Sequence, residues 1–164
     1  MKILFDAMGG DNAPDANITG AVNAIEKINA EIILIGNEKI LNERIKELYG
    51  KENINELSDR IKIVNAEEEI TMEDSPTKTK KNSSMVVGFN MLKNGEGDVF
   101  LSAGNSGALL AGATLLVGRI KGIDRPALAA MLPAFEGRFL LMDAGANTNC
   151  KTINILQFAQ MAGI

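Results

Sequence analysis

Residues 98–110 read Asp98-Val-Phe-Leu-Ser-Ala-Gly-Asn-Ser-Gly-Ala-Leu-Leu110, an apolar strand that leads through a short glycine turn into an apolar helix. Gly104 and Gly107 lack a Cβ, so the turn can adopt backbone angles closed to other residues and let a ligand approach. Ser106 can cap the helix that starts beside it, and the first N–H groups of a helix attract anions. Two interpretations stay open: an anion site, or an ordinary turn whose glycines only permit tight packing.

The same order of residues occurs twice more in the chain. Residues 2–14 read Lys2-Ile-Leu-Phe-Asp-Ala-Met-Gly-Gly-Asp-Asn-Ala-Pro14, and residues 138–147 read Arg138-Phe-Leu-Leu-Met-Asp-Ala-Gly-Ala-Asn147. In each, a strand ends in Asp or Ser and is followed by a small residue and a glycine turn. The carboxyl ends of parallel strands share one edge of a sheet, and ligands bind outside it. We therefore expect the three turns to meet around one site.

The first 64 residues alternate between strand and helix patterns. Apolar runs predict strands over residues 3–5, 31–36 and 61–64, and helical spacing predicts helices over 14–29 and 40–48. This β-α-β-α-β order is typical of a parallel sheet with crossover helices. The chain is therefore expected to be an α/β protein and, from its length of 164 residues, a single domain.

The later segments continue the pattern and then change it. We expect a helix over residues 86–92, capped by Asn82 or Ser83 and ended by Gly95. The helix over 107–118 is apolar on every side and should be buried. Residues 127–132 and 139–142 are spaced as a hairpin, and a last helix is expected over 153–161.

Composition restricts the chemistry. The chain has no histidine, one cysteine and a net charge of −4. Histidine-based triads and zinc sites are excluded, a nucleic-acid binder is disfavoured, and we expect neither a metal nor a cofactor. No signal peptide or membrane-spanning run is seen, so a cytoplasmic location is expected.

Residues 67–81 interrupt the alternation, being first acidic and then basic. The segment is either a mobile surface loop or a flap that brings Lys78, Lys80 and Lys81 over an anionic ligand.

Four blocks of this sequence resemble, in order, the bacterial phosphate acyltransferase family PlsX. The blocks are Phe5-Asp-Ala-Met-Gly-Gly-Asp-Asn-Ala-Pro14, Ser102-Ala-Gly-Asn-Ser-Gly-Ala-Leu109, Gly118-Arg-Ile-Lys-Gly-Ile-Asp-Arg-Pro-Ala-Leu128 and Asp143-Ala-Gly-Ala-Asn147. The resemblance covers the whole chain but only about the first half of the usual family length. It implies a three-layer α/β/α sandwich with a mostly parallel sheet, related to isopropylmalate dehydrogenase and phosphotransacetylase.

The activity implied by the resemblance is transfer of a fatty acyl group from acyl carrier protein to inorganic phosphate, giving acyl phosphate for phospholipid synthesis. Family members act as homodimers and contact the membrane peripherally. This chain departs from the family pattern in three places. Residues 76–83 look about a helical turn shorter, Asn149 and Thr152 stand where Asp and Pro are expected, and the residues that complete the groove would follow Ile164.

Phosphate is a nucleophile and a thioester is an activated donor, so the protein has mainly to position both and stabilise the carbonyl oxygen. We expect the amides of residues 104–107 to do this, with Asn105 and Ser106 as the catalytic side chains; helix capping and turn formation are the alternative roles. The substrate-binding set is Asp6, Gly9, Gly10, Asp11, Asn12, Lys81, Ser102, Gly104, Gly107, Asp143, Gly145 and Asn147.

Some members of this set have a second interpretation. Asp6 and Asp143 are expected to orient other groups, because their charge repels phosphate, and Asp11 and Asn12 to fix the first turn or cap its helix. Cys150 is not expected to be a nucleophile, since no histidine can activate it.

The alternative function is a non-catalytic domain that binds phosphate or a small anion, or an inactive fragment. A dehydrogenase is disfavoured because no G-x-G-x-x-G motif occurs.

Overall fold

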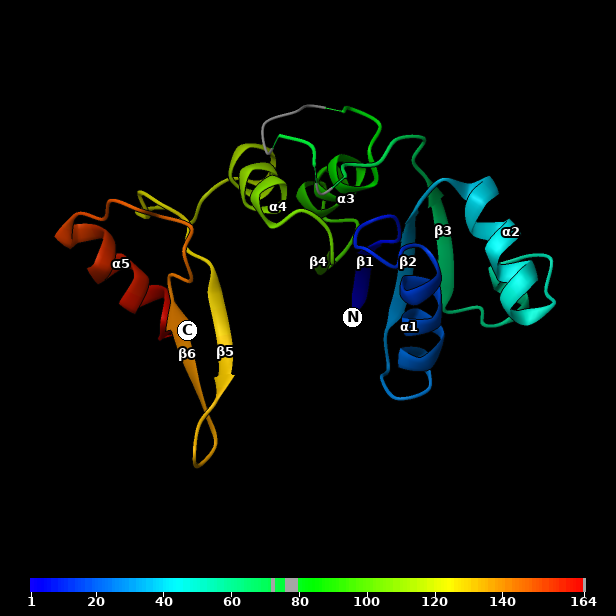
Figure 1. The fold of residues 1–164 in the computed structure, drawn as a ribbon, viewed down its shortest axis with the longest axis horizontal. Helices are drawn as coiled ribbons and strands as arrows, with labels where there is room; N and C mark the ends of the chain where they lie inside the picture. The colour runs from blue at the N-terminus through cyan, green and yellow to red at the C-terminus, as the bar shows by residue number, and fades with distance from the viewer. Residues whose placement is uncertain (72, 76–79, 164) are drawn as a thin grey trace. The chain divides into compact units, whose positions relative to one another are not determined.

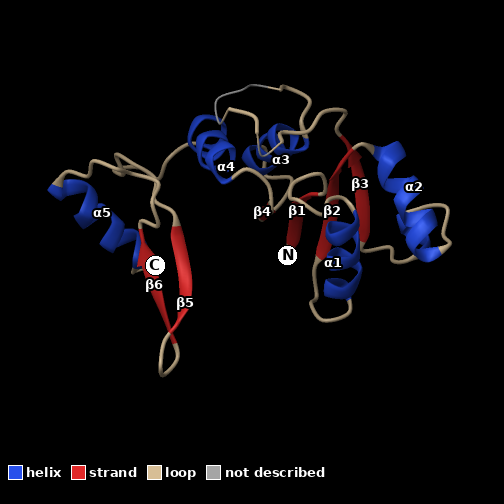
Figure 2. Ribbon diagram, viewed as in Figure 1, coloured by secondary structure: helices blue, strands red, loops and turns tan. Residues whose placement is uncertain are grey.

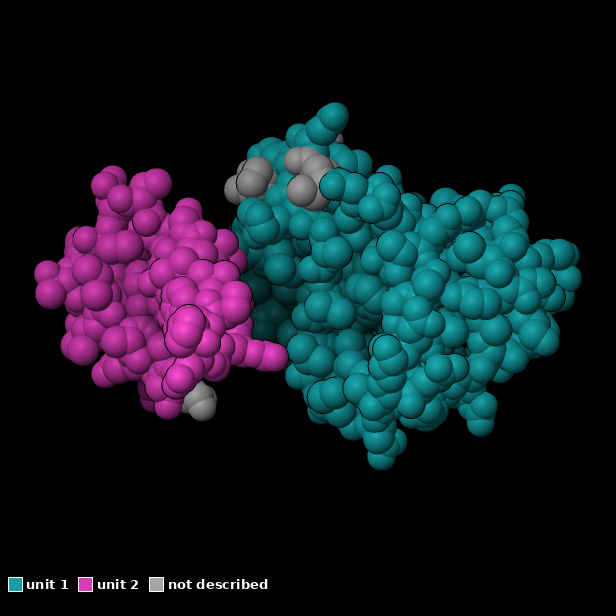
Figure 3. All heavy atoms as spheres, turned by 60° about the horizontal axis from the view of Figure 1, so that its bottom comes forward, with its two compact units in different colours: residues 1–117 teal, residues 118–164 magenta. Residues whose placement is uncertain are grey.

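The structure, a computed structural model, describes residues 1–71, 73–75 and 80–163. Contacts divide the chain into two compact units, Met1–Val117 (unit 1) and Gly118–Ile164 (unit 2), which Figure 3 draws in different colours.

Unit 1 contains a four-stranded parallel sheet (Figures 1 and 2). Its strands, in the order β3-β2-β1-β4, are β3 (Ile61–Asn65), β2 (Glu31–Gly36), β1 (Lys2–Asp6) and β4 (Val99–Leu101). The register places Leu4 beside Ile33 on one side and Phe100 on the other. The chain adds β2 and β3 on one side of β1 and then returns to place β4 on the other. The strand order therefore reverses between β1 and β4, which is where open α/β sheets form a ligand crevice.

Helices cover both faces of this sheet, as expected for a three-layer sandwich. Helices α1 (Asp15–Ile25) and α2 (Glu38–Tyr49) pack with Ile32 and Leu34 of β2 in one core cluster. Helix α3 (Ser84–Lys93) packs with Ile33 and Ile35 in another. Successive residues of a strand point to opposite faces, so the continuous apolar run of β2 is buried between two helical layers. A short 3-10 helix, η1 (Ile54–Glu56), precedes β3.

The helix after β4 differs from the expectation in two ways. It consists of α4 (Ser106–Gly112) and a wider π-helical stretch, η2 (Ala113–Val117), and its N-cap is Asn105, not Ser106. Within unit 1 it is covered on one face only: Ala108 is buried, whereas Leu115 is 77% exposed. Burial on every side is therefore not found among the described residues.

Unit 2 contains a hairpin and one helix. Strands β5 (Ala129–Pro133) and β6 (Arg138–Met142) pair antiparallel, which confirms the predicted hairpin, and α5 (Thr152–Ala162) follows. Within the described ranges, no helix has both the length and the apolar character needed to cross a membrane.

Candidate functional site

Two of the three glycine turns lie against each other at the point where the strand order reverses. A Cβ built on Gly104 would lie 3.1 Å from the Cα of Gly9, and one on Gly10 would lie 3.2 Å from the carbonyl oxygen of Ala103. Gly10 also has a φ of +112°, in the region that favours glycine. The turn after β1 and the turn after β4 are thus in backbone contact, which confirms their predicted proximity.

A side-chain pair, the buried Asp6 and the half-buried Ser102, joins these turns. Asp6, the last residue of β1, is 2% exposed, and its Oδ2 accepts a hydrogen bond of 2.7 Å from the Oγ of Ser102, which follows β4. Its Oδ1 accepts from the Met8 N–H at 3.2 Å, and the Gly104 N–H donates to the Ser102 Oγ at 3.1 Å. The carboxylate is therefore satisfied by one hydroxyl and one amide.

Asn17 of α1 also shapes the first turn, although the sequence did not single it out. Its Nδ2 donates to the carbonyl oxygens of Asp6, Ala7 and Gly9 at 3.3, 3.0 and 2.9 Å, and the residue is 7% exposed. The sequence contains a signal for this role, because Asn17 lies four residues before Ala21 on the buried face of α1. A polar residue in such a row usually holds a buried partner.

Several N–H groups of the two turns have no hydrogen-bond acceptor within the described part of the chain. Among the described residues, none accepts a hydrogen bond from the backbone N–H of Gly10, Ser106 or Gly107. The side chain of Ser106 is exposed at the start of α4. Unpaired amides of this kind bind anions.

The Asn105 side chain has a structural role at the start of α4, and its expected catalytic role stays a prediction. Its Oδ1 accepts from the Ala108 N–H at 3.0 Å, as an N-cap. Its Nδ2 donates to the carbonyl oxygens of Thr71 and Asp74 at 3.3 and 3.1 Å. Asn105 therefore connects α4 to the segment that precedes α3, and Gly107 lies in the first turn of the same helix.

The remaining predicted residues of unit 1 lie at the surface. Asp11 and Asn12 are exposed, and α1 begins after Pro14 with no side-chain cap. The expectation that Asp11 or Asn12 caps this helix is therefore wrong, because the position before its first residue is occupied by proline.

The lysines expected in a flap have different environments. Lys81 is exposed, whereas Lys80 donates through Nζ to the Glu69 carbonyl oxygen and to Asp74 Oδ2, both at 2.7 Å. Lys78 lies outside the described residues. The flap itself stays a prediction.

The third turn belongs to unit 2 and is closed by its own residues. Asp143 accepts from the N–H groups of Leu128, Ala146 and Asn147 and from the Asn147 side chain, at 3.1, 3.3, 2.8 and 2.9 Å. Burial acts to raise the pKa of Asp143, but these four hydrogen bonds outweigh it and hold the pKa below its ordinary value. Gly145 has a φ of +90°. The meeting of this turn with the other two stays a prediction.

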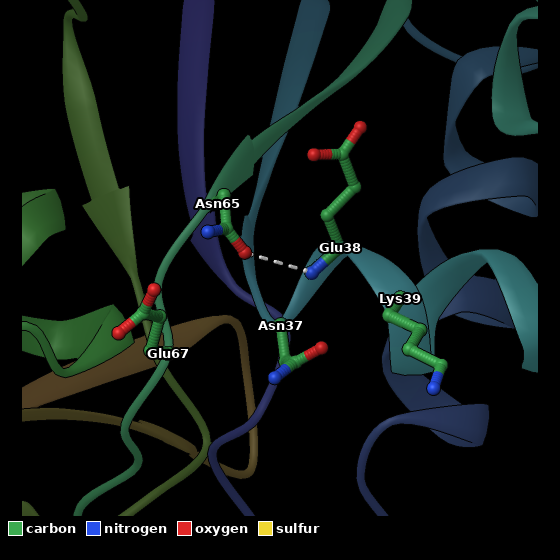
Figure 4. Close-up of a pocket in the computed structure, with 5 residues that line it drawn as sticks. All are labelled: Asn37, Glu38, Lys39, Asn65 and Glu67. Atoms are coloured by element: carbon green, nitrogen blue, oxygen red, sulfur yellow. Dashed lines mark hydrogen bonds between the residues drawn. The ribbon is translucent and has the colours of Figure 1, made fainter.

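A hollow of about 460 Å³ lies at the ends of β2 and β3, lined by Asn37, Glu38, Lys39, Asn65 and Glu67 (Figure 4). The Oδ1 of Asn65 accepts from the Glu38 N–H at 3.1 Å, and Asn37 caps α2 through the Ile40 N–H. The N–H groups at the start of α2 are therefore partly hydrogen-bonded to side chains already. The hollow is lined by two carboxylates and one lysine, so its net charge is negative. This hollow is not suited to phosphate.

Cys150 is exposed and its Sγ lies 3.9 Å from the Asn147 carbonyl oxygen. Over the described part of the chain, no cluster of three or more side chains is arranged to hold a metal ion.

Comparison with known proteins gives a consistent picture. A family model described as "Fatty acid synthesis protein" matches residues 1–164. The chain is 52% identical to a phosphate acyltransferase of Acetivibrio thermocellus, 49% to one of Alkaliphilus oremlandii and 48% to one of Clostridioides difficile. Each alignment covers 100% of this chain and 48% of the relative.

The chain thus spans about half the length of the curated relatives it matches. The three alignments extend over 168 positions, against 164 residues in this chain, so four positions have no counterpart here. This agrees with a deletion of about one helical turn but does not locate it.

Proposed function

The chain belongs to the fatty acid synthesis protein family, and on that premise we propose that it is the N-terminal half of an acyltransferase. The proposed enzyme transfers a fatty acyl group from acyl carrier protein to inorganic phosphate. A phosphate oxygen attacks the thioester carbonyl carbon, a C–O bond forms, and the C–S bond breaks. The products are acyl phosphate and the carrier-protein thiol, which takes up a proton.

The observation that carries the proposal is the pair of touching glycine turns with unpaired amides. The N–H groups of Gly10, Ser106 and Gly107 have no acceptor among the described residues, and they belong to turns in backbone contact at the reversal of strand order. Fixed N–H donors stabilise negative charge without reorganising, both on phosphate and on a carbonyl oxygen that gains charge in the transition state. This chemistry needs no histidine, and the chain contains none.

The residues of the proposed site have distinct tasks. The amides of Gly10, Ser106 and Gly107 surround the phosphate, and the exposed Ser106 hydroxyl is a side-chain donor at the start of α4. Asn105 holds α4 and the preceding segment in place through its cap and its two bonds to carbonyl oxygens. Gly145, Asn147 and Lys81 join the set on the strength of the sequence pattern alone.

The partners belong to the same proposal. The family resemblance supports acyl carrier protein as a partner, a homodimer and peripheral contact with a membrane. The proposed cytoplasmic location rests on the sequence pattern instead.

The test uses the full-length protein with a long-chain acyl thioester of carrier protein. We expect thiol release that depends on inorganic phosphate and equals the acyl phosphate measured by mass spectrometry. Ser106→Ala should slow this release, whereas Ser58→Ala should not, because Ser58 lies before β3 at the opposite edge of the sheet. Phosphate binding without thiol release would instead support the non-catalytic anion-binding domain.

A further inference from the structure

We propose that Asp6 and Ser102 are a pair of positioning residues whose hydrogen bond sets the spacing between the two glycine turns, and that neither contacts phosphate. The kinetic part of this inference rests on the proposed function; its structural part does not.

The pair lies in a continuous line of hydrogen bonds. The Gly104 N–H donates to the Ser102 Oγ at 3.1 Å, and the Ser102 hydroxyl donates to Asp6 Oδ2 at 2.7 Å. The other carboxylate oxygen accepts the Met8 N–H at 3.2 Å. One amide from each turn is thus anchored to the same carboxylate, across 96 residues of sequence.

The glycines fit closely over this pair. A Cβ on Gly9 would lie 2.5 Å from Asp6 Oδ2 and 2.9 Å from the Ser102 Oγ, and one on Gly104 would lie 3.1 Å from the Gly9 Cα. Only a residue without a side chain can occupy position 9 while the pair remains intact. The backbone of both turns therefore packs directly against the hydrogen-bonded side chains of Asp6 and Ser102. The length of this hydrogen bond sets how closely the two turns approach each other.

Burial and charge keep Asp6 from contacting the ligand, and existing hydrogen bonds occupy the half-buried Ser102. Asp6 is 2% exposed, and its charge is matched by a hydroxyl and an amide, with no cation among its hydrogen-bond partners. A carboxylate in direct contact with phosphate would repel it, but one beneath the turns can orient their amides. The Ser102 Oγ already donates to Asp6 and accepts from Gly104. The free N–H groups of Gly10, Ser106 and Gly107 are then the donors left for the anion.

The first experiment is a double-mutant cycle in the full-length enzyme, with Ser102→Ala, Asp6→Asn and the double variant. Loss of a hydrogen bond to a charged group should raise the KM for phosphate by roughly ten- to a hundredfold. The KM for the acyl thioester should change less than threefold. Asp6→Asn should be the milder single variant, because its amide can still pair with Ser102 and with the Met8 N–H.

The double variant should be no worse than Ser102→Ala, since Asp6→Asn acts through the bond that Ser102→Ala has already removed. Effects on the phosphate KM that multiply would mean that Ser102 or Asp6 contacts the substrate independently, and would overturn the proposal.

The second experiment needs no activity. Hydrogen exchange in the full-length protein, followed by mass spectrometry, should be faster in Ser102→Ala both in peptides covering residues 7–13 and in peptides covering residues 103–107. The control Ser58→Ala, which removes a hydroxyl that accepts the Arg60 N–H at 3.2 Å, should leave both regions unchanged. Faster exchange near residue 102 alone would show that the pair does not link the turns. A wild-type enzyme that makes no acyl phosphate would contradict the proposed function, and the exchange result would still decide this inference.

Discussion

Gly9 is the residue at which the site tolerates the least change. Any side chain there meets the carboxylate of Asp6 and the hydroxyl of Ser102 at distances below normal contact. These two atoms are themselves hydrogen-bonded at 2.7 Å, so neither can move away without breaking the bond.

We expect Gly9→Ala to lower the catalytic efficiency of the full-length enzyme with phosphate at least tenfold, because the added methyl group forces the two turns apart. The matched control is Gly20→Ala in α1, where a Cβ would meet no atom within 4 Å. The control should keep full activity and gain about 0.5–1 kcal/mol in the free energy of unfolding, since alanine favours a helix over glycine. Equal activities of the two variants in a steady-state assay would show that the contact at Gly9 is not required.

The pKa of Asp143 is the second property set by single residues. It is lowered because four hydrogen bonds outweigh the effect of burial, and the Asn147 side chain donates one of them at 2.9 Å. The folded chain therefore binds fewer protons at this carboxyl than the unfolded chain does. The resulting stabilisation is complete at neutral pH and is lost as the pH falls through the ordinary aspartate range toward the lowered pKa.

Asn147→Ala should raise the pKa of Asp143 toward its ordinary value, because a side-chain donor to Oδ2 is removed. Carboxyl ¹³C NMR titration of the 164-residue chain measures this shift. Asn149→Ala is the control, since among the described residues only the backbone oxygen of Asn149, not its side chain, has a hydrogen-bond partner. An unchanged Asp143 pKa in Asn147→Ala would mean that the backbone donors alone hold it down.

The sequence predicted which residues lie at the two touching turns but not what their side chains do. Asp6 ends β1 and Ser102 directly follows β4, and a strand followed by a small polar residue can be recognised from the sequence alone. The hydrogen bond between them joins residues 96 positions apart and depends on the strand order. Asn105 caps α4 and donates to the carbonyl oxygens of Thr71 and Asp74, and its expected catalytic role stays a prediction. Capping and catalysis favour the same small polar residues, so the residue type could not separate these roles.

At the scale of elements, α3 lies against β4 at a glycine. A Cβ on Gly88 would lie 2.1 Å from the Phe100 ring, and that ring is paired with Phe89 at a centroid distance of 4.8 Å. Gly112 of α4 lies against Phe89 in the same way, at 2.3 Å. The layer that supports the second glycine turn thus depends on two glycines facing two aromatic rings.

Gly88→Ala should lower the free energy of unfolding by about 1–3 kcal/mol, the usual effect of an added methyl group in a filled core. Urea unfolding of the 164-residue chain measures it. The double variant Gly88→Ala/Phe100→Leu should recover part of the loss, because leucine leaves room for the methyl group. If Phe100→Leu adds its own loss to that of Gly88→Ala with no recovery, the contact is not the cause.

The elements themselves were largely predictable, because their signals are local. The parallel β-α-β-α-β segment, the Ser83 cap of α3 and the hairpin of β5 and β6 all agree with the sequence patterns. The helix after β4 was harder, since its composition predicts burial but not where it widens into η2. Apolar composition does not indicate which element packs against each face of this helix. Within unit 1, only one face of the helix is buried.

For the whole molecule, all three core clusters belong to unit 1. Its four-stranded sheet has helices on both faces, whereas unit 2 has a two-stranded sheet and one helix. A pair of strands is marginally stable at best by itself.

Residues 1–117 produced alone should therefore fold, with a single cooperative urea transition and helical circular dichroism, and residues 118–164 alone should not. Cooperative unfolding of 118–164 would show that unit 2 has a sufficient core of its own. A chain of residues 1–117 without a transition would show that unit 1 does not.

The proposed phosphate site, formed by the turns after β1 and β4, can be tested by selective ¹⁵N-glycine labelling of the full-length protein. Titration with inorganic phosphate should shift the amide resonances of Gly9, Gly10, Gly104 and Gly107 together, along one saturation curve. If these four resonances stay in place while those of Gly118 and Gly122 move, the anion binds in unit 2, near Arg119, Lys121 and Arg125. That result, or acyl phosphate formation with none of the four affected, would contradict the account.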